Sequence, residues 1–595
     1  MKNVFKRVMA ALLSLIMVLS LAACGAPADD KTTDAPKATD APATNAPGDK
    51  ETEASTDAAE FDPKTITEGV TLTIAVEADD EVIDWNTNMT TLMLEEKFGV
   101  DLQFEAYAAG SFGDKLNVMI NGGDELPDII FGGGTKGLNS YQANWVETGA
   151  ILELTEFYEN PDYAKYINIA IEKEGTDFVD TMRDAEGKLW AMPKYYSTNN
   201  NDATAYRLWI NTEYAKACGF DELPTTTEGF FELCKAFAAA GDLNGNGIDD
   251  EVVFTGKEDA NEPWFQFLMT PFAYAWDDHK LDVENGVLTF AYATEGWKEG
   301  LKYIKQFFDE GLIDTTILTQ DKAARNAIQQ NPECILLADF YYQPQMKGGN
   351  NFETMKLRLK HDYVVALEGP SGRIETYYSD TLAYPGAMIT TDCENPEAAF
   401  IVMDYMMSQT LSLYQRFGEE GVDWDYWENV DNSKFIDGST KDLYLALDGK
   451  SEPQFVSYTN TKYWGTGTPQ NKGYMLAGPG IQFGAAEGRT LKPGDTEESQ
   501  VTSEWNLKYW KDCIGDCMKY IPEERIITLP LTGEENNKVA EPQKVIEKYW
   551  QEAAANFLTG VWDIDEYWDT YLAELEKMGM SDLLAIYQAS YDRMK

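Results

Sequence analysis

Strand and helix signals alternate along the chain from about residue 66. Val70–Val76 (VTLTIAV) is short and rich in β-branched residues, which is typical of a strand, and Thr87–Phe98 has helical spacing. The alternation continues with a strand over 100–106, a helix over 112–120 and a strand over 126–131. Because consecutive βαβ units build a mainly parallel sheet with helices on both faces, this order predicts an α/β fold.

Three segments follow the carboxyl ends of these strands: Asp79–Asn88, Ala108–Ser111 and Gly132–Tyr141. Ligands of open α/β sheets bind beyond the carboxyl ends of the strands. We therefore expect these segments to be loops at a ligand site.

A second block of signals begins near Ala205. A strand is predicted over 206–210, and helices over 212–217, 227–240 and 297–310. Helical patterns dominate after about Asn395 and end in two long helices, predicted over 542–558 and 564–578. Single hydrophobic cores stop growing near ~250–300 residues, so a chain of this length predicts two lobes.

The N-terminus has the pattern of a targeting segment. Lys2, Lys6 and Arg7 precede an apolar run over 8–23 that is shorter than the ~20 residues of a membrane span, which predicts a cleaved signal peptide, residues 1–23. The run ends in Leu-Ala-Ala-Cys24, which resembles a bacterial lipobox and implies lipidation of Cys24. The alternative is an ordinary secretory signal with a cysteine there by chance.

Residues 24–65 are predicted to be a disordered tether that follows the lipidated cysteine. They are rich in Ala, Thr, Pro and Asp, with near-repeats at Thr33–Pro36 and Thr39–Pro42, and lack the apolar content that would offset the entropy of ordering. A coil of this length reaches on the order of 35 Å. It would hold a soluble body close to the membrane surface.

The charge of the chain disfavours two classes of partner. Its 101 acidic and 48 basic residues give a net charge of −53. A field of this sign repels nucleic acid and anionic lipid headgroups, and it makes a polyanionic ligand less favourable. No nucleic-acid partner is therefore expected.

Cysteine and histidine usage offers little for metal or nucleophilic chemistry. Apart from Cys24, we interpret the cysteines as small buried hydrophobes, although Cys513 and Cys517 are four residues apart in a helical pattern and could lie close together. The chain has two histidines, His279 and His361, which disfavours a zinc site and a serine or cysteine hydrolase. The disulfide status of these cysteines stays open.

The sharpest local motif is Asp242-Leu-Asn-Gly-Asn-Gly-Ile-Asp-Asp-Glu251. Oxygen-bearing residues at positions 1, 3 and 5 with glycine at position 6 match the first half of an EF-hand calcium loop. Position 12 is Val253 instead of glutamate, so we expect earlier carboxylates to close the site. The predicted calcium ligands are Asp242, Asn244, Asn246, the carbonyl of Ile248, Asp250 and Glu251. The alternative is a metal-free Asn/Gly-rich turn.

Aromatic residues are dense, with 15 Trp, 32 Tyr and 27 Phe. Sugars present flat C–H faces ringed by hydroxyls, so carbohydrate sites combine aromatic rings with polar side chains; a single ring is nevertheless more often part of a core. Aromatic residues with polar neighbours give the predicted ligand-binding set: Trp85, Asn86, Tyr195, Tyr196, Trp276, Tyr378, Asp380, Trp424 and Trp427.

Several motifs, taken in order, resemble one family: the extracellular solute-binding proteins of bacterial carbohydrate ABC importers. They include Leu126-Pro-Asp-Ile129, Gly187-Lys-Leu-Trp-Ala-Met-Pro193, Leu208-Trp-Ile-Asn211, Pro224-Thr-Thr-Thr227 and Glu310-Gly-Leu-Ile-Asp314. The C-terminal segment from Leu575 to Arg593 fits the long Gram-positive-type members, and the Asp242 loop is similar to the calcium loop of the alginate-binding branch.

The resemblance implies a periplasmic-binding-protein-like fold (class II) with two α/β lobes and a helical C-terminal extension. We expect an N-terminal lobe formed by residues 66–193 and 368–440, and a C-terminal lobe formed by 194–367 and 441–595. Ligand binding would close the lobes by a hinge, which the importer's membrane subunits could recognise.

The sequence therefore predicts a monomeric, lipid-anchored protein on the extracytoplasmic face of the cell membrane. It would bind a carbohydrate, more specifically an oligosaccharide, and deliver it to an ABC importer without catalysis. One alternative is a surface-anchored glycoside hydrolase that uses a pair of carboxylates, and such a pair can always be found among 101 acidic residues. Another alternative is a ligand sensor with the same fold.

Overall fold

The computed structural model describes residues 61–595 apart from short segments. Those outside the description are 109, 133–143, 176, 197–203, 249, 257–262, 278, 321, 330–335, 341–342, 345–351, 380–382, 436–439, 442–443, 446–451, 459–468, 476, 484–489, 492–496 and 595. The predicted lipidation site Cys24 and the predicted ligand residue Asp380 thus lie outside the described residues.

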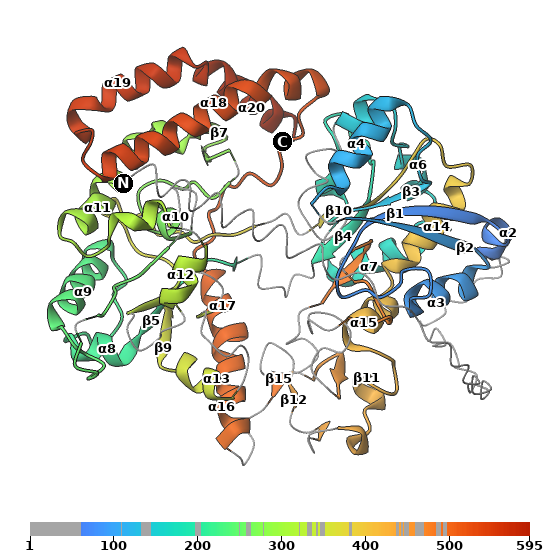
Figure 1. The fold of residues 1–595 in the computed structure, drawn as a ribbon, viewed down its shortest axis with the longest axis horizontal. Helices are drawn as coiled ribbons and strands as arrows, with labels where there is room; N and C mark the ends of the chain where they lie inside the picture. The colour runs from blue at the N-terminus through green and yellow to red at the C-terminus, as the bar shows by residue number, and fades with distance from the viewer. Residues whose placement is uncertain are drawn as a thin grey trace, which may run out of the picture. The chain divides into compact units, whose positions relative to one another are not determined.

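A six-stranded mixed sheet organises the first lobe (Figure 1). Its strands, in spatial order, are β14 (Gly480–Gln482), β4 (Met192–Tyr196), β10 (Ala383–Ile389), β3 (Ile129–Phe131), β1 (Thr71–Glu77) and β2 (Asp101–Tyr107). β1 pairs in parallel with β2 and β3, β10 is antiparallel to β3 and β4, and β14 is parallel to β4. The first three strands and their parallel pairing are as the sequence predicts.

Helices pack on both faces of this sheet because alternate strand residues point to opposite sides. On β1, Ile74 contributes to a core shared with α3 (Met89–Phe98), α14 (Pro396–Met406) and α15 (Gln409–Phe417). Its neighbour Ala75 contributes to a second core with Phe112 and Leu116 of α4 (Phe112–Gly122). At the end of β3, Gly132 is required, since a Cβ there would lie 2.3 Å from the Pro385 carbonyl of β10.

The second lobe is built on a three-stranded antiparallel sheet, β8 (Leu337–Asp339), β5 (Leu208–Asn211) and β9 (His361–Val364). A hairpin of β6 (Leu281–Glu284) and β7 (Val287–Phe290) turns at Asn285-Gly286, both at positive φ. The helices α8 (Thr212–Ala217), α9 (Thr227–Ala240), α10 (Pro263–Met269) and α11 (Glu295–Asp309) surround one large hydrophobic core.

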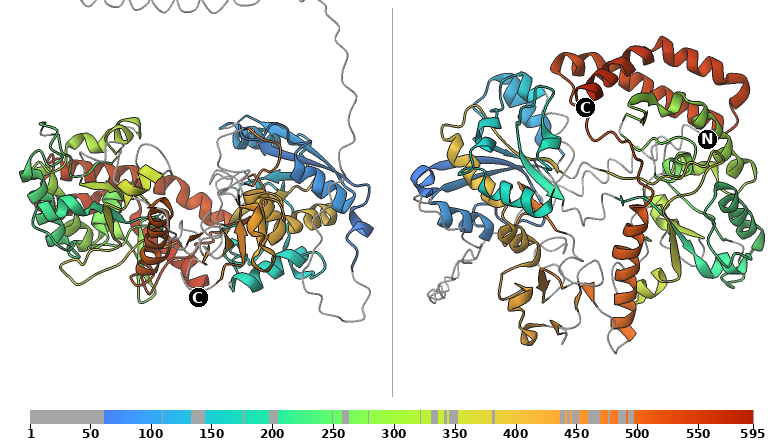
Figure 2. Two further views of the ribbon diagram at one scale, coloured as in Figure 1. Left: turned by 90° about the horizontal axis from the view of Figure 1, so that it is seen from below. Right: turned by 180° about the vertical axis from the view of Figure 1, so that it is seen from behind.

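The C-terminal extension consists of α18 (Gly533–Leu558), α19 (Ile564–Lys577) and α20 (Met580–Arg593). Trp550, Phe557 and Trp568 pack into the same core as α11, so these helices belong to the second lobe (Figure 2). α18 begins nine residues before the predicted start at Pro542, which lies inside the helix. The sequence suggested a proline at the first helical turn, but the Thr532 capping box starts the helix earlier.

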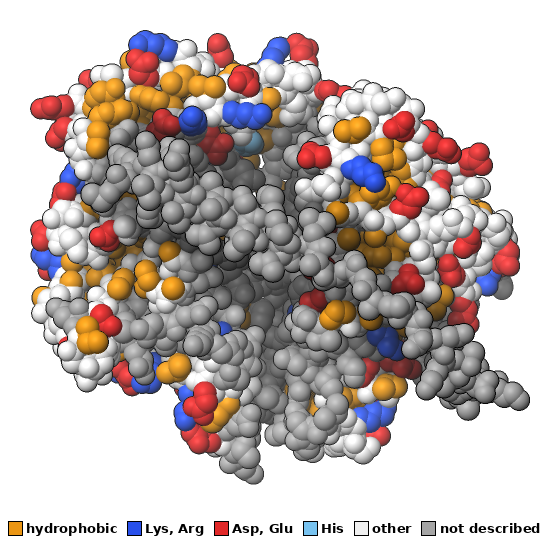
Figure 3. Space-filling model, in the orientation of Figure 1, with side chains coloured by type: hydrophobic (Ala, Val, Ile, Leu, Met, Phe, Trp, Pro, Cys, Tyr) orange, Lys and Arg blue, Asp and Glu red, His pale blue; other side chains and the backbone are white. Residues whose placement is uncertain are grey.

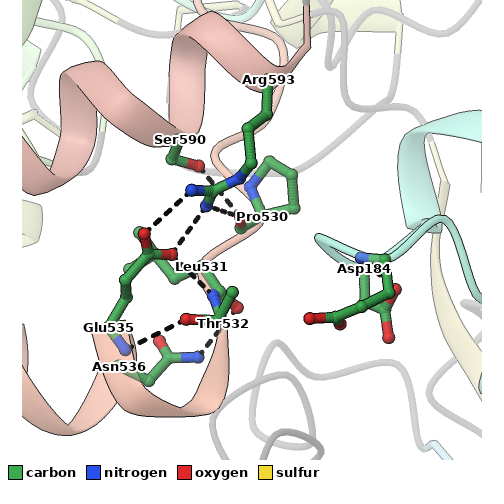
Figure 4. Close-up of polar contacts among 9 residues, drawn as sticks. Asp184, Pro530, Leu531, Thr532, Glu535, Asn536, Ser590 and Arg593 are labelled. Carbon is green, nitrogen blue, oxygen red and sulfur yellow. Dashed lines mark hydrogen bonds and ion pairs between the residues drawn. The ribbon is translucent and has the colours of Figure 1, made fainter.

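Polar contacts join the two ends of this extension (Figure 4). Arg593 of α20 donates to both carboxylate oxygens of Glu535, at 2.9 and 2.7 Å, and also to the Pro530 carbonyl. Glu535 accepts a bond from the Thr532 amide, and Ser590 donates to the Pro530 carbonyl. Hydrogen bonds from Arg593 lower the pKa of Glu535 to about 2.

The remaining elements are short. They are α2 (Lys64–Thr67), α6 (Thr155–Glu159), α7 (Lys165–Glu174), α12 (Lys322–Gln329), α13 (Phe352–Arg358), α16 (Glu497–Asn506), the π-helical turn η9 (Leu507–Cys513), α17 (Ile514–Cys517), and the strand pairs β11 (Trp424–Tyr426) with β13 (Phe455–Ser457) and β12 (Tyr444–Leu445) with β15 (Thr490–Leu491). Short 3₁₀ turns complete the described chain.

The cores show which segments belong to each lobe. The first lobe's core resumes at Ala383 after the second lobe's strands and continues through Phe455 to Phe483, beyond the predicted limit at residue 440. The difference arises because β14 pairs with β4 and places Ile481 in the first sheet. Trp505 and later residues pack with the second lobe, against Trp209 of β5.

Candidate ligand-binding and metal-binding sites

Three half-buried aromatic rings meet in the second lobe, from segments far apart in the sequence. Tyr206 stacks on Trp276 with ring centroids 4.7 Å apart and an interplanar angle of 13°. Tyr377 approaches both edge-on, at 4.6 Å from Tyr206 and 5.2 Å from Trp276. We call these three residues the aromatic cluster. Its partial exposure leaves ring surface that an apolar sugar face could contact.

Hydrogen bonds fix the orientation of the Trp276 ring. Its Nε1 donates to the Thr270 hydroxyl at 2.7 Å, and that hydroxyl donates to the Gln266 carbonyl at 2.7 Å. Gln266 lies within α10, Thr270 directly follows the helix, and both are buried. A ring held in this way needs little ordering when a ligand arrives, which lowers the entropic cost of binding.

Charged groups lie close to the aromatic cluster. Arg373 donates to Asp282 of β6 at 2.8 Å and to Glu375 at 2.7 Å, and all three side chains are largely buried. Burial raises the pKa of Asp282 and of Glu375, although Arg373 opposes the rise in both. Arg373 thus links Asp282 of β6 to Glu375, which lies two residues before Tyr377 in the sequence.

Two of the predicted ligand residues belong to this region. Trp276 is in the aromatic cluster, and Tyr378 is half-buried beside it with the Arg525 guanidinium 5.2 Å from its ring centroid. Arg525 is itself held by a 2.7 Å bond to the Pro522 carbonyl. Tyr206 was not predicted, whereas Tyr377 is signalled in the sequence by the Tyr377-Tyr378 pair, of which Tyr378 alone was in the predicted set.

Three predicted ligand residues prove to be core residues. Trp85 is 7% exposed and packs against Phe104 and Tyr474, Tyr195 is fully buried and stacks on Phe178 at 4.0 Å, and Trp424 is fully buried. The Trp424 Nε1 donates to the Gly418 carbonyl at 2.7 Å, so its polar atom is already satisfied. Polar neighbours in the sequence suggested exposed rings, but β-strand and loop packing covers these three.

The other three predicted residues lie apart from the aromatic cluster. Asn86 is exposed, and its side chain accepts from the Phe104 amide at 2.7 Å, which ties the segment after β1 to β2. Tyr196 is half-buried and accepts a hydrogen bond from the Tyr384 hydroxyl at 3.1 Å. Trp427 is half-buried under the Lys441 ammonium, 4.5 Å from the ring centroid.

The predicted calcium loop follows α9 and folds around its own side chains. Asp242 accepts from the amides of Asn246 and Gly247, at 2.9 and 2.8 Å. Asn244 and Asn246 each accept from the amide two residues ahead, at 2.8 and 2.7 Å. Gly247 has φ 85°, as the sharp turn at position 6 requires.

The carboxylates after the turn support a mixed ligand set. Glu251 Oε1 accepts from the amides of Leu243 and Asn244, at 2.8 and 3.2 Å, while its Oε2 is buried without a hydrogen-bond partner. Asp250 accepts from the Asn246 amide group at 3.2 Å. No three His, Cys, Asp or Glu side chains in the described part of the chain gather closely enough to hold a metal by themselves. An ion here would use amide and carbonyl oxygens as well, which fits the Ca²⁺ preference for oxygen ligands.

Sequence comparisons find relatives that include a transporter's substrate-binding protein and a lipoprotein. No protein-family model matches the chain. It is 25% identical over 520 residues to the fructooligosaccharide ABC transporter substrate-binding protein FusA of Streptococcus pneumoniae serotype 4, covering 86% of this chain and 88% of that relative. It is 24% identical over 368 residues to lipoprotein LipO of Bacillus subtilis, covering 60% of this chain and 68% of the relative.

Solved structures give the same picture for the fold. FusA of S. pneumoniae in complex with kestose superposes with a TM-score of 0.61 at 23% identity, over 88% of this chain and 99% of that one. An extracellular solute-binding protein from Bifidobacterium longum subsp. infantis gives 0.64 at 18% identity, over 88% and 98%. The chain has a solute-binding-protein fold. The predicted two-lobed, periplasmic-binding-protein-like class is thereby confirmed, as is the resemblance to carbohydrate ABC transporter binding proteins.

Two further similarities concern calcium and the membrane. Structures similar to this chain include an EF-hand mutant of FusA (TM-score 0.60, 22% identity) and the alginate-binding protein AlgQ2 without calcium ion (0.57, 18%), each over 88% of this chain. LipO is named a lipoprotein. Among the residues that the structure describes, no helix is long and apolar enough to cross a membrane.

Proposed function

We propose that this protein binds an oligosaccharide at the aromatic cluster of its second lobe and delivers it to an ABC importer without catalysis. The observation that carries the proposal is the stacked pair of Tyr206 and Trp276, half-buried and pre-oriented through Thr270. The 25% identity to a fructooligosaccharide-binding relative supports the choice of ligand class. Aromatic rings bury apolar sugar faces, while neighbouring polar groups give orientation.

The test is a panel of neutral oligosaccharides, including kestose, screened by thermal shift against the purified chain. We expect at least one to raise the melting temperature, because a ligand that binds only the folded state stabilises it by mass action. The same mixtures, held for hours and separated by chromatography, should contain no shortened sugars. Release of products would contradict a pure binding role and favour a glycoside hydrolase.

The same proposal includes a lipid anchor at Cys24 on the extracytoplasmic face of the membrane. The support is the lipobox-like Leu-Ala-Ala-Cys24 and the lipoprotein relative. Expression in a bacterium that lipidates proteins should place the chain in the membrane fraction, and Cys24→Ala should release it to the medium or periplasm. Membrane retention of the Cys24→Ala variant would contradict the anchor.

We also propose that the loop from Asp242 to Glu251 binds a structural calcium ion through Asp242, Asn244, Asn246, the Ile248 carbonyl, Asp250 and Glu251. The buried Glu251 Oε2 without a partner is the observation in its favour, since a cation would satisfy it. When bound, the ion would tie the end of α9 to the segment leading towards Val253. It takes no part in contacting the sugar.

Chelation should lower the melting temperature of the purified protein by several degrees, and added Ca²⁺ should restore it. Glu251→Gln keeps an acceptor for the Leu243 amide but weakens cation binding, so chelation should shift its melting temperature much less. Glu222→Gln, an exposed glutamate before α9, is the matched control and should behave as wild type. Equal responses to chelator in the Glu251→Gln variant and the wild type would contradict the site.

A further inference from the structure

Two cysteines lie together in a small hydrophobic core of the second lobe. Cys513 ends the π-helical turn η9, Cys517 ends α17 (orange in Figure 1), and both side chains are fully buried. Residues four apart on a helix lie on the same face, and both thiols belong to the small core formed with Trp209, Trp505 and Tyr509. The other described cysteines, at 218, 234 and 393, have no such neighbour in the sequence.

The surroundings of the two thiols differ. The pKa of Cys517 is lowered, first by a hydrogen bond from Cys513 and then by the Arg207 guanidinium, whereas burial raises the pKa of Cys513. The Thr376 hydroxyl is buried without an oxygen or nitrogen partner and also favours the Cys517 thiolate. The pair thus combines a thiol disposed to lose its proton with a neighbour that keeps one, as in pairs of attacking and resolving cysteines.

We propose that Cys513 and Cys517 are a redox-active dithiol that is oxidised to an intramolecular disulfide by small disulfides outside the cell. The Cys517 thiolate attacks one sulfur of the external disulfide, forms a mixed disulfide and releases one thiolate. Cys513 then loses its proton and attacks Cys517 Sγ, which releases the second thiolate. The dithiol loses two electrons and two protons, and the external disulfide gains them to become two thiols.

A disulfide between Cys513 and Cys517 requires the local backbone to change. A helical i,i+4 pair has Cα atoms about 6 Å apart, within the disulfide range, but its Cβ atoms must come closer than on a regular helix. The π-helical turn before Cys513 and the helix end at Cys517 are the irregular points where the chain can tighten. Because both thiols are buried, oxidation requires local opening of this turn and is therefore slow.

Oxidation of the two cysteines would affect the proposed ligand site through two residues that adjoin the aromatic cluster in the sequence. Arg207 follows Tyr206, and Thr376 precedes Tyr377, so the partners of the Cys517 thiol are the chain neighbours of two cluster rings. A disulfide removes the Cys517 thiol that these groups face. We expect the rings to shift, with roughly tenfold weaker binding of kestose, comparable to the loss of one buried hydrogen bond.

The test is incubation of the folded full-length chain with oxidised glutathione, followed by alkylation and peptide mass spectrometry without reduction. We expect a peptide containing a Cys513–Cys517 disulfide that dithiothreitol reverses. Cys513→Ser should instead trap glutathione on Cys517, and Cys517→Ser should leave Cys513 unmodified. Cys234→Ser, which removes an isolated buried thiol, should behave as wild type. Melting curves of each variant check that it is folded.

If Cys513 and Cys517 stay fully reduced in the native protein, or if Cys513→Ser traps no glutathione on Cys517 while remaining folded, the dithiol proposal is wrong. Kestose titration of the oxidised and reduced forms tests the coupling: equal affinities contradict it. The disulfide readout needs no ligand, so failure of the binding function and failure of the dithiol are distinguishable.

Discussion

At the scale of single residues, Lys194 is the most unusual side chain of the first lobe. It is 1% exposed on β4, and its ammonium donates to the Met475 carbonyl. Burial, and then the nearby Arg416 cation, lower its pKa to about 7.

Lys194 makes stability depend on pH in the alkaline range. Between pH 7 and the ordinary lysine pKa near 10.4, the unfolded chain binds more protons than the folded one, so the free energy of unfolding rises with pH. Below pH 7 both states are protonated and the burial penalty is fully present. Lys194→Met should be more stable than wild type at pH 6.5, by on the order of a few kcal/mol, and the difference should shrink towards pH 10.

Urea unfolding of both proteins at several pH values measures this difference. Lys216→Met, which removes an exposed lysine on α8, is the control for the change in net charge. A constant difference between the Lys194→Met variant and wild type across pH 6.5–10 would show that Lys194 does not titrate in this way.

The predicted ligand residues show what the sequence alone cannot decide. Trp276 and Tyr378 were predicted because rings beside polar residues favour sugar contacts, yet the same pattern at Trp85, Tyr195 and Trp424 marks core residues. Sequence neighbours cannot reveal which face of a ring is covered by packing from elsewhere. The Tyr206–Trp276 stack joins segments 70 residues apart in the numbering, and only the fold brings them together.

At the scale of elements, capping residues and terminal glycines made the helix boundaries predictable. Asn88 caps α3 by accepting from the Thr90 amide, Gly99 ends it in the left-handed region, and Thr226 caps α9. The start of α18 was misplaced because Pro542 suggested a first turn, while the capping box ten residues earlier decides it. Strand pairing across the chain, as between β14 and β4, has no local signal, so the lobe limits could not be predicted accurately.

The capping box of α18 predicts a local stability effect. Thr532 accepts from the Glu535 amide, and Thr532→Ala removes this bond at a cost of about 1 kcal/mol. Amide hydrogen exchange over the first turns of α18 should then accelerate about fivefold. Thr559→Ala, an exposed threonine at the other end of the same helix, should leave exchange in these turns unchanged. Unaltered exchange in the Thr532→Ala variant would mean that the cap does not hold the helix start.

At the scale of the whole molecule, the net charge of −53 bears on the class of ligand. Carboxylates are spread over the visible surface (Figure 3), so their field acts on any charged ligand that approaches. A neutral oligosaccharide carries no charge for this field to repel. Affinity for kestose should therefore be nearly independent of salt, because no ion pairs form or break.

An acidic oligosaccharide such as a digalacturonate should bind more weakly than kestose at low ionic strength. The difference in affinity between the two sugars should decrease as salt shortens the Debye length from ~30 Å at 0.01 M to ~10 Å at 0.1 M. Titrations of both sugars at the two salt concentrations give the comparison. Tighter binding of the acidic sugar at low salt would contradict the assignment to neutral ligands.

The central claim is that an oligosaccharide binds at the aromatic cluster without being cleaved. Its most direct measurement is calorimetric titration of kestose into wild type and two matched variants. Trp276→Ala removes one face of the stack, and Trp562→Ala removes a half-buried ring that stacks on Tyr567 at 4.3 Å in the C-terminal extension. We predict at least tenfold weaker binding for Trp276→Ala, in line with ~1.5 kcal/mol for an aromatic contact, and wild-type affinity for Trp562→Ala. Equal affinity in wild type and Trp276→Ala, with both proteins folded, would contradict the account.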